Sequence, residues 1–477
     1  MTRAITGGPA HRLYTVVVFI VLASLDNVAI GLVPPLYQPI AASFDVAEAA
    51  VSAATAATYL VSAFASVAWA YAGDRTDRKP LLMLGTLIWA AGTLGSAVAP
   101  NYLVFLAAQI VGAVGLGAVG SVGFSVVSDL IAPRRRGLVM SFWGLSQGLG
   151  LLIGTLVAGL LGAHDWRRPF YVITVIGVAA TVAYLFTYNI RRGQSEPQLA
   201  GVFAQGDEYG YRISRADLPV IMHRRTNVWL VWQGLTAQLV FGSLVFLPRL
   251  FQAKAAAIGF DEPTAIQIGS VYATLFQLGG ALSILGGLIG DRWQRRNPRG
   301  RAMVAAIGIL AGIPFYVVLF FVPLRLDSAD VAGQGAVGAV LGSVVTQPVM
   351  TMSFVAALLA LAFTSANSPN WFALITEVNP PEHRGTVYSL GNLVNGVGRA
   401  AGNSLVGVTF RALEKALPPP LNFAVGMAAF QVFFIPTGVM YWLASRSSPK
   451  DIADVQHLLA DRAIETTTHE GTRAPAS

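Results

Sequence analysis

Cysteine is missing from the 477-residue sequence, and charged side chains are scarce. Without cysteine the chain forms no disulfides and holds no iron–sulfur cluster or thiolate-bound metal. Its six histidines are scattered over loops and ends, without the spacing of a metal site or the context of a catalytic nucleophile. No nucleotide-binding loop is present. The sequence therefore predicts no enzyme, no cofactor and no metal site.

The low charge content also excludes an ordinary globular protein. Only 12% of the residues are Asp, Glu, Lys or Arg, against roughly a quarter in typical globular chains. Hydrophobic residues make up 54%, and 49 residues are glycine, which membrane helices tolerate. Twelve segments are each long enough to cross about 30 Å of hydrocarbon. These spans are 13–33, 50–72, 80–99, 102–127, 137–162, 169–190, 228–250, 266–289, 302–323, 350–374, 386–410 and 423–445. We predict an all-α membrane protein with twelve transmembrane helices.

The polar segments divide the chain. Residues 1–190 form a first bundle of six helices, a cytoplasmic linker covers 191–226, and residues 227–446 form a second bundle. Residues 447–477 are a polar tail. The first span follows His11 and Arg12 and lacks a small-residue cleavage site, so we expect a retained helix.

The net charge of +8 suggests nucleic-acid binding, but its distribution favours a membrane topology. If the amino terminus lies inside, 24 of the 32 Lys and Arg residues lie on the inner side, seven on the outer side, and Arg399 within a span. This is the positive-inside pattern, with both termini cytoplasmic. We expect a multi-pass protein of the inner or plasma membrane that contacts anionic lipid headgroups, acts as a monomer and binds no nucleic acid.

Two charged phrases occur twice. YAGDRTDRKP at 71–80 returns as LIGDRWQRRN at 288–297, and PRRRGLVMS at 133–141 returns as PEHRGTVYS at 381–389. The second offset of 248 residues also relates Asp129 to Glu377, and Gly148, Gly150, Gly154 and Gly159 to Gly396, Gly398, Gly402 and Gly407. The chain is therefore predicted to be two related halves in parallel orientation, with glycines that allow close helix packing.

The offset grows from 217 to 248 between the two phrases, which places about 31 additional residues between spans 8 and 11. The outer segment 324–349 has the room for them. We interpret it as a longer crossover, with a lid or partner-docking element as the alternative, and do not expect a thirteenth span near 336–347.

With its twelve spans, parallel repeat and Asp-Arg-x-x-Arg-Arg loops, the whole chain resembles the major facilitator superfamily. The resemblance implies inner-side charge networks that hold this face shut and break on opening. Their members are Asp74, Arg75, Arg78, Asp129, Arg136, Asp291, Arg292, Arg295, Glu377 and Arg384. Asp74 would pair with Arg136 near Asp129, and Asp291 with Arg384 near Glu377. The alternative is that these bases only set the topology.

Within that superfamily the chain looks most like spinster-like transporters, from LDNVAIGLVPPLYQPIAASF in span 1 and the loop GDRTDRK. Asp26 matches the acid that the family has in span 1. Gln109 and Leu116 replace that family's charged residues in span 4, and Arg399 stands where it usually has an acid in span 11. The charged residues that couple transport in that family can therefore not all be assigned to positions of this chain.

Asp26 is the candidate proton carrier, because an acid in hydrocarbon is costly unless it is paired, hydrated or protonated. A neutral acid bonded between helices is the alternative. Arg399 stays charged, so it requires Asp26, an anionic substrate, or polar groups between packed helices. The other mid-span polar or aromatic candidates for a substrate cavity are Asn27, Gln233, Gln238, Gln277, Asn367, Asn370, Trp371, Asn392 and Asn395.

These features favour a secondary active transporter that works by alternating access, with proton-coupled export of an amphiphilic, lipid-like or drug-like molecule. One alternative is a symporter or facilitator of a small organic anion, for which Arg399 would be the anchor. An alternative of another class is a membrane sensor or partner protein that transports nothing.

Overall fold

The computed structural model describes residues 9–123, 126, 136–187 and 217–471, and every regular element in these ranges is helical. The first half contains α1 (Pro9–Leu32), the 3-10 turn η1 (Pro34–Leu36), α2 (Tyr37–Ser43), α3 (Glu48–Arg75), α4 (Arg78–Ala97), α5 (Tyr102–Ala118) with a π-helical turn at Val119–Gly123, α7 (Arg136–Gly162) and α8 (Arg168–Leu185). The second half contains α10 (Asp217–His223), α11 (Arg225–Leu244), α12 (Leu247–Ala257), α13 (Glu262–Gln277), η5 (Leu278–Leu282), α14 (Ser283–Gln294), α15 (Gly300–Phe321), α16 (Ser328–Thr346), α17 (Pro348–Ser365), α18 (Asn367–Glu377), α19 (Pro381–Glu414), α20 (Leu421–Phe430), η6 (Gln431–Phe433) and α21 (Phe434–Gly471).

These helices confirm the predicted membrane fold. Eleven helices among the described residues are long and apolar enough to cross a membrane, and all but α16 coincide with predicted spans. The other two predicted spans are α7, with a shorter apolar stretch at Gly148–Gly162, and α19, whose polar residues keep its hydropathy low. The spans of the second half are interrupted more often. α13, η5 and α14 together form one span, and so do α17 and α18.

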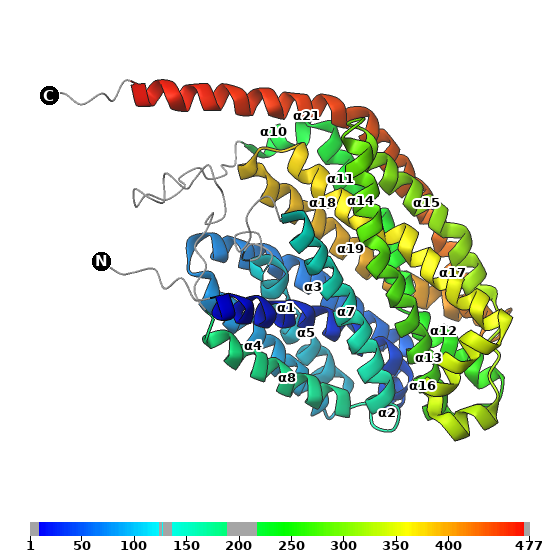
Figure 1. Ribbon diagram of the computed structural model, residues 1–477. Coiled ribbons are helices and arrows are strands. Elements are labelled where there is room, and N and C mark those ends of the chain that lie inside the picture. Colours follow the sequence, from blue (N-terminus) through cyan, green and yellow to red (C-terminus); the bar gives the residue numbers. More distant parts are fainter. Residues whose placement is uncertain (1–8, 124–125, 127–135, 188–216, 472–477) are drawn as a thin grey trace.

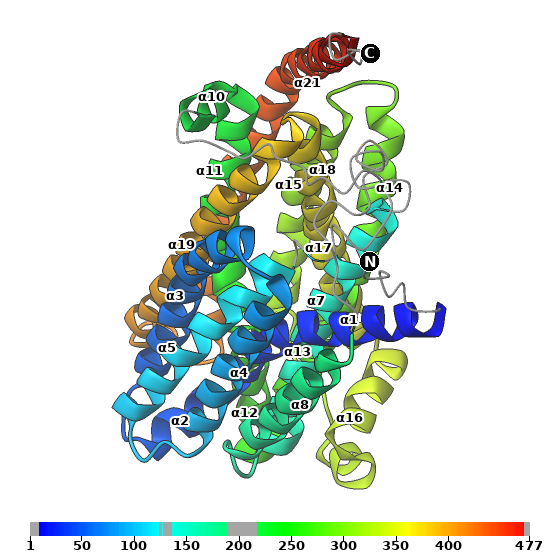
Figure 2. The same cartoon turned by 90° about the vertical axis from the view of Figure 1, so that its left-hand side faces the viewer.

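The helices gather into two bundles, α1–α8 and α11–α21, which lie side by side (Figure 1). We call the end that holds α10, the start of α15 and the end of α18 the inner end. The opposite end, which holds α2, α12 and α16, is the outer end (Figures 1 and 2).

The repeated glycines bring equivalent helices together in the two halves. A Cβ on Gly150 or Gly154 of α7 would overlap the backbone of α1 at Ser24 or Val28. Equivalent glycines of α19 do the same against α11: Gly398 lies on the carbonyl of Leu235, and Gly402 lies on that of Leu239. The predicted close packing is confirmed at these four glycines, whereas Gly148 has open space around it, and the repeat is visible as matching contacts.

The outer segment 324–349 contains α16, a helix that the sequence analysis did not predict. Glu377 at the end of α18 pairs with Arg301 at the start of α15, so α15 leaves the inner end and α17–α18 returns to it. α16 therefore connects two points at the outer end and does not reverse the topology. It bends at Gly335, whose φ is 71°, and packs against α13 and α17.

The predicted tail after residue 446 continues the last span as a helix, since α21 extends to Gly471. It bears a proline at position 449. Asp451 accepts a hydrogen bond from the backbone N–H of Thr226, at 3.0 Å, in the first turn of α11. A carboxylate is favourable at a helix N-terminus, so this contact fixes the start of the tail on the second half.

Candidate functional site

The two halves meet through two pairs of helices, α3 with α19 and α7 with α13. In each pair the second span of one half packs on the fifth span of the other, so the internal repeat relates the two contacts. We call the first contact the α3–α19 seam. It pairs Ala63 with Gly396, Ala56 with Ala400, and Ser52 with Asn403. The two helices are therefore antiparallel, with mostly small side chains between them.

Polar side chains close the outer part of the α3–α19 seam. Ser52 Oγ donates to Asn403 Oδ1 at 3.1 Å, and Asn403 Nδ2 donates to the Tyr37 hydroxyl at 3.4 Å. All three side chains are buried. Because buried polar groups are costly without partners, this set favours a closed outer end.

An ion pair between the halves lies one turn further out. Arg249 of α12 donates to Glu48 at the start of α3 through Nε at 3.0 Å and through a terminal nitrogen at 2.8 Å. The Arg249 and Glu48 side chains are 15% and 31% exposed. The guanidinium also lies over the ring of Phe423, 5.3 Å from its centroid. We call this pair the outer latch. Neither Glu48 nor Arg249 was among the residues predicted from the sequence.

The second contact between the halves is also tight toward the outer end. A Cβ on Gly159 of α7 would overlap the side chain of Ser270 on α13. Nearby, the Gln252 side-chain amide of α12 donates to the Pro35 carbonyl in η1 at 2.8 Å. Both pairs of helices are therefore packed at the outer end.

Arg399 lies on the α3–α19 seam, inward of these contacts. Its Nε donates to Gln238 Oε1 of α11 at 2.9 Å, and its guanidinium lies 5.6 Å from the centroid of the Tyr59 ring on α3. Arg399 and Gln238, both predicted cavity residues, are thus brought together. Tyr59 was not predicted. It reaches them from the other half, and its own hydroxyl is buried without a hydrogen-bond partner.

Several other predicted cavity residues serve packing within the second half. Asn370 and Trp371 donate to the carbonyls of Gly286 and Leu230 at 3.1 and 2.9 Å, and both are buried. Gln233 is buried and donates to the Leu230 carbonyl at 3.2 Å. The bonds of Asn370 and Trp371 join neighbouring helices, and the bond of Gln233 lies within α11.

The remaining cavity candidates are partly exposed. Asn367 accepts a hydrogen bond from the Tyr441 hydroxyl, and Gln277 lies at the end of α13. Asn27 lies on α1, and Asn392 and Asn395 lie on α19. Asn395 contacts α11 where Gly234 leaves room for its amide oxygen.

Some predicted residues fall outside what the structure describes. Asp26 is placed as a backbone position of α1, near the middle of the apolar span Leu13–Ser43, and its side chain is not described. The same holds for the side chains of Asp74, Arg75 and Arg136, and Asp129 lies outside the described residues altogether. The proton carrier and much of the first inner network stay predictions.

The second inner network is centred on Arg301, which the sequence analysis did not single out. Arg301 lies 2.9 Å from Asp291 Oδ1 and 3.1 Å from Glu377 Oε1. Gln294 donates to the other oxygen of Glu377 at 2.9 Å. These contacts tie α14, α15 and α18 together at the inner end.

The predicted bases around this network differ in their surroundings. Arg384 donates through Nε to the Asn379 carbonyl at 3.1 Å. Arg292 and Arg295 are exposed. In the first half, Arg78 is buried, and Lys79 donates to the carbonyls of Leu185 and Thr187 at the end of α8. A cation at a helix C-terminus is stabilising, so Lys79 has a clear structural role.

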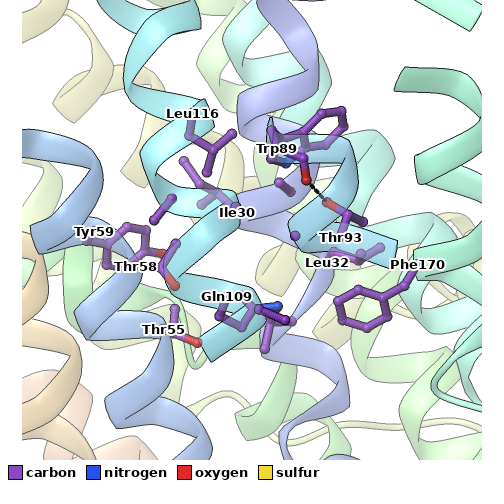
Figure 3. A pocket seen from close by; sticks show the side chains of 16 residues that line it. Ile30, Leu32, Thr55, Thr58, Tyr59, Trp89, Thr93, Gln109, Leu116 and Phe170 are labelled. Carbon is purple, nitrogen blue, oxygen red and sulfur yellow. Dashed lines mark hydrogen bonds between the residues drawn. The ribbon is translucent and has the colours of Figure 1, made fainter. Parts of the chain in front are cut away.

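A small cavity lies inside the first half, between α1, α3, α4, α5 and α8 (Figure 3). Apolar side chains such as Leu32, Trp89 and Phe170 line it together with Thr58 and Gln109. Its volume is about 30 Å³, enough for one or two water molecules. In this conformation it is too small for a lipid-like substrate.

Comparison with known proteins places these features in a family. The sequence matches the Major Facilitator Superfamily over residues 17–403. It is 27% identical over 286 residues to protein spinster homolog 3 of Danio rerio, which covers 56% of this chain and 54% of that protein. It is 26% identical over 269 residues to the sphingosine-1-phosphate transporter SPNS2 of Xenopus tropicalis, over 54% of this chain and 50% of that protein. The chain thus spans about half the length of the curated relatives it matches.

Solved structures share the fold over a larger part of the chain. One is a bacterial homolog to the human lysosomal transporter spinster, in an inward-facing and occupied conformation. It superposes with a TM-score of 0.68 at 18% identity, over 93% of this chain and 99% of that one. A D-xylose–proton symporter superposes with a TM-score of 0.63 at 14% identity, over 90% and 97%.

Proposed function

The chain belongs to the major facilitator superfamily, and on that premise we propose that it is a secondary active transporter that exports an amphiphilic small molecule in exchange for protons. It is a multi-pass membrane protein. We place it in the inner or plasma membrane with both termini in the cytoplasm, as its basic loops favour.

One observation carries the proposal of alternating access. The two halves touch through two helix pairs that the repeat relates, and both pairs are packed at the outer end. Among the described residues the contacts are small side chains, a few polar groups and the Glu48–Arg249 ion pair, which can separate and re-form. Two related bundles that rock about such contacts expose a central site to each side in turn.

Proton coupling rests on Asp26. Its backbone lies near the middle of the apolar span Leu13–Ser43, where a permanently charged carboxylate is costly. A carrier of protons has to visit both its charged and its neutral state, and a membrane-embedded acid does so when it gains and loses water or partners. An amphiphilic cargo fits the few charges and many aromatic side chains of the spans, and a relative is described as a sphingosine-1-phosphate transporter.

The test is uptake into proteoliposomes of known orientation, with candidate amphiphiles and an imposed pH gradient. We expect the wild-type chain to accumulate cargo only with the gradient. Asp26→Asn should lose accumulation and keep exchange of cargo across the membrane. Asp261→Asn, which changes an exposed acid at the outer end, is the matched control and should behave as wild type.

Full gradient-driven accumulation by Asp26→Asn would refute the assignment of the proton carrier and favour a facilitator. Absence of any cargo movement in the wild-type protein, across amphiphiles and small organic anions, would favour a non-transporting sensor.

A further inference from the structure

Arg399 has an incomplete set of partners. A guanidinium carries five N–H donors and keeps its charge at any physiological pH. Its Nε donates to the neutral amide of Gln238, and the guanidinium carbon lies 5.6 Å from the centroid of the Tyr59 ring. Within the described part of the chain, the two terminal nitrogens have no hydrogen-bond acceptor. The edge of the guanidinium formed by its two terminal nitrogens is therefore available to an oxyanion.

A polar stripe on α19 leads to this edge from the inner end. Asn392, Asn395 and Arg399 follow at intervals of three and four residues, so they share one face of the helix. All three are partly exposed, whereas Asn403, the next polar position outward, is completely buried. Arg399 is thus the outermost partly exposed residue of the stripe, and the next polar residue outward is buried in the α3–α19 seam.

We propose that Arg399 binds the anionic group of the cargo, so that the substrate is an amphiphile with a carboxylate or phosphate. This inference rests on the proposed transport function and names the substrate class. A fixed cation within a membrane span needs a counter-charge, and an amide oxygen with an aromatic ring supplies only part of it. The planar fork of the guanidinium matches the two oxygens of a carboxylate or phosphate.

The site has members from both halves. Gln238 and Arg399 belong to the second half, and Tyr59 belongs to the first. Gln238 holds one side of the guanidinium, which leaves the opposite edge directed away from α11. When the α3–α19 seam separates, Tyr59 has to leave Arg399, so the surroundings of a bound anion change with the conformation. Binding and opening are therefore coupled through one side chain.

The test measures binding without any gradient, on the full-length protein in nanodiscs of neutral phosphatidylcholine. The probes are dodecyl phosphate, which is anionic, and dodecyl maltoside, which has the same alkyl chain and no charged group. We expect Arg399→Gln to weaken binding of dodecyl phosphate roughly 10- to 100-fold, near the lower limit for loss of a buried charge pair because Arg399 is partly exposed, and to leave binding of dodecyl maltoside unchanged. Arg411→Gln, an exposed arginine of the same helix, is the control.

A second variant keeps the test decisive if Arg399→Gln does not fold. Gln238→Glu preserves the size of the side chain and gives Arg399 an internal counter-charge, so it should also weaken dodecyl phosphate selectively. Equal loss for both probes, or no loss for either, would overturn the inference. Inorganic phosphate that binds as tightly as dodecyl phosphate would overturn the assignment of an amphiphile.

The outcomes separate this inference from the proposed function. Selective binding of dodecyl phosphate with no transport would keep the anion site and refute transport. Gradient-driven transport that is unaffected by Arg399→Gln would support the proposed transport and refute the anion site.

Discussion

Replacing Glu48 by Gln should shift the protein toward conformations that are open at the outer end. Glu48 and Arg249 join the two halves by two hydrogen bonds of 3.0 and 2.8 Å. The substitution keeps the size of the side chain and removes the charge of one partner. Arg249 retains its contact with the Phe423 ring, 5.3 Å away, so the second half itself should stay folded.

The expected size of the shift follows from the burial of the pair. Fully exposed ion pairs contribute about 0.2–1 kcal/mol, and loss of one partner of a fully buried pair costs about 3–5 kcal/mol. With side chains 15% and 31% exposed, the outer latch lies between these limits. A contribution of about 1–2 kcal/mol changes the ratio of closed to open molecules roughly 5- to 30-fold.

A cysteine on the seam reports this ratio, because the natural chain has no cysteine. Ala56 is 6% exposed and packs in one cluster with Tyr59 and Ala400, so Ala56→Cys should react with an impermeant maleimide only when the seam opens. While open molecules are the minority, the labelling rate from outside is proportional to their population. Adding Glu48→Gln should raise that rate roughly 5- to 30-fold.

Glu262→Gln is the matched control, since Glu262 is an exposed acid at the outer end, and it should leave labelling unchanged. Exchanging the two charges, Glu48→Arg with Arg249→Glu, should restore slow labelling. A rate that stays at the wild-type level in Glu48→Gln would refute the latch. So would a charge exchange that labels as fast as the single variant.

The other predictions concern both ends of the protein. Gly159→Ala should disturb the contact of α7 with Ser270 and raise outer labelling, whereas Gly148→Ala, with open space around it, should not; equal labelling would contradict the packing argument. Asp291→Asn should weaken the inner network and raise labelling of cysteines on the inner side without unfolding, and unchanged labelling would reject that network as a gate. Deleting residues 328–346 should permit membrane insertion with a modest loss of thermal stability, because only one side of α16 is buried; loss of folding would show that the helix is core structure.

The sequence predicted the fold because its strongest signals are local or periodic. Apolar spans follow from the thickness of a bilayer, and the repeated phrases gave the two halves. The glycines of α7 and α19 were predicted to pack closely, and Gly154 and Gly402 do so at equivalent backbone positions. α16 was missed because its composition, rich in Gly, Ala and Val, has no strong helical periodicity.

The site was harder to predict, because its contacts join residues far apart in the chain. Glu48 and Arg249 are separated by 201 positions, and neither belongs to a repeated phrase. Arg301 was counted among the inner bases but not recognised as the partner of Asp291. The sequence did single out Arg399 and Gln238, since each is an unusual residue within a span. It offered no way to know that Tyr59 lies beside them.

The position of Arg399 links cargo binding to the closure of the outer end. Asn403, which bonds to Ser52 across the seam, lies four residues further along the same helix, and Tyr59 bridges the two halves at the level of the guanidinium. An anion that binds better while Tyr59 is in place must stabilise the closed seam by the same factor, because coupling between two equilibria is reciprocal. Dodecyl phosphate should then slow the labelling of Ala56→Cys, and Arg399→Gln should abolish this protection. An exporter needs this order of events, since cargo that enters from the inner end must meet a sealed outer end before the halves rock.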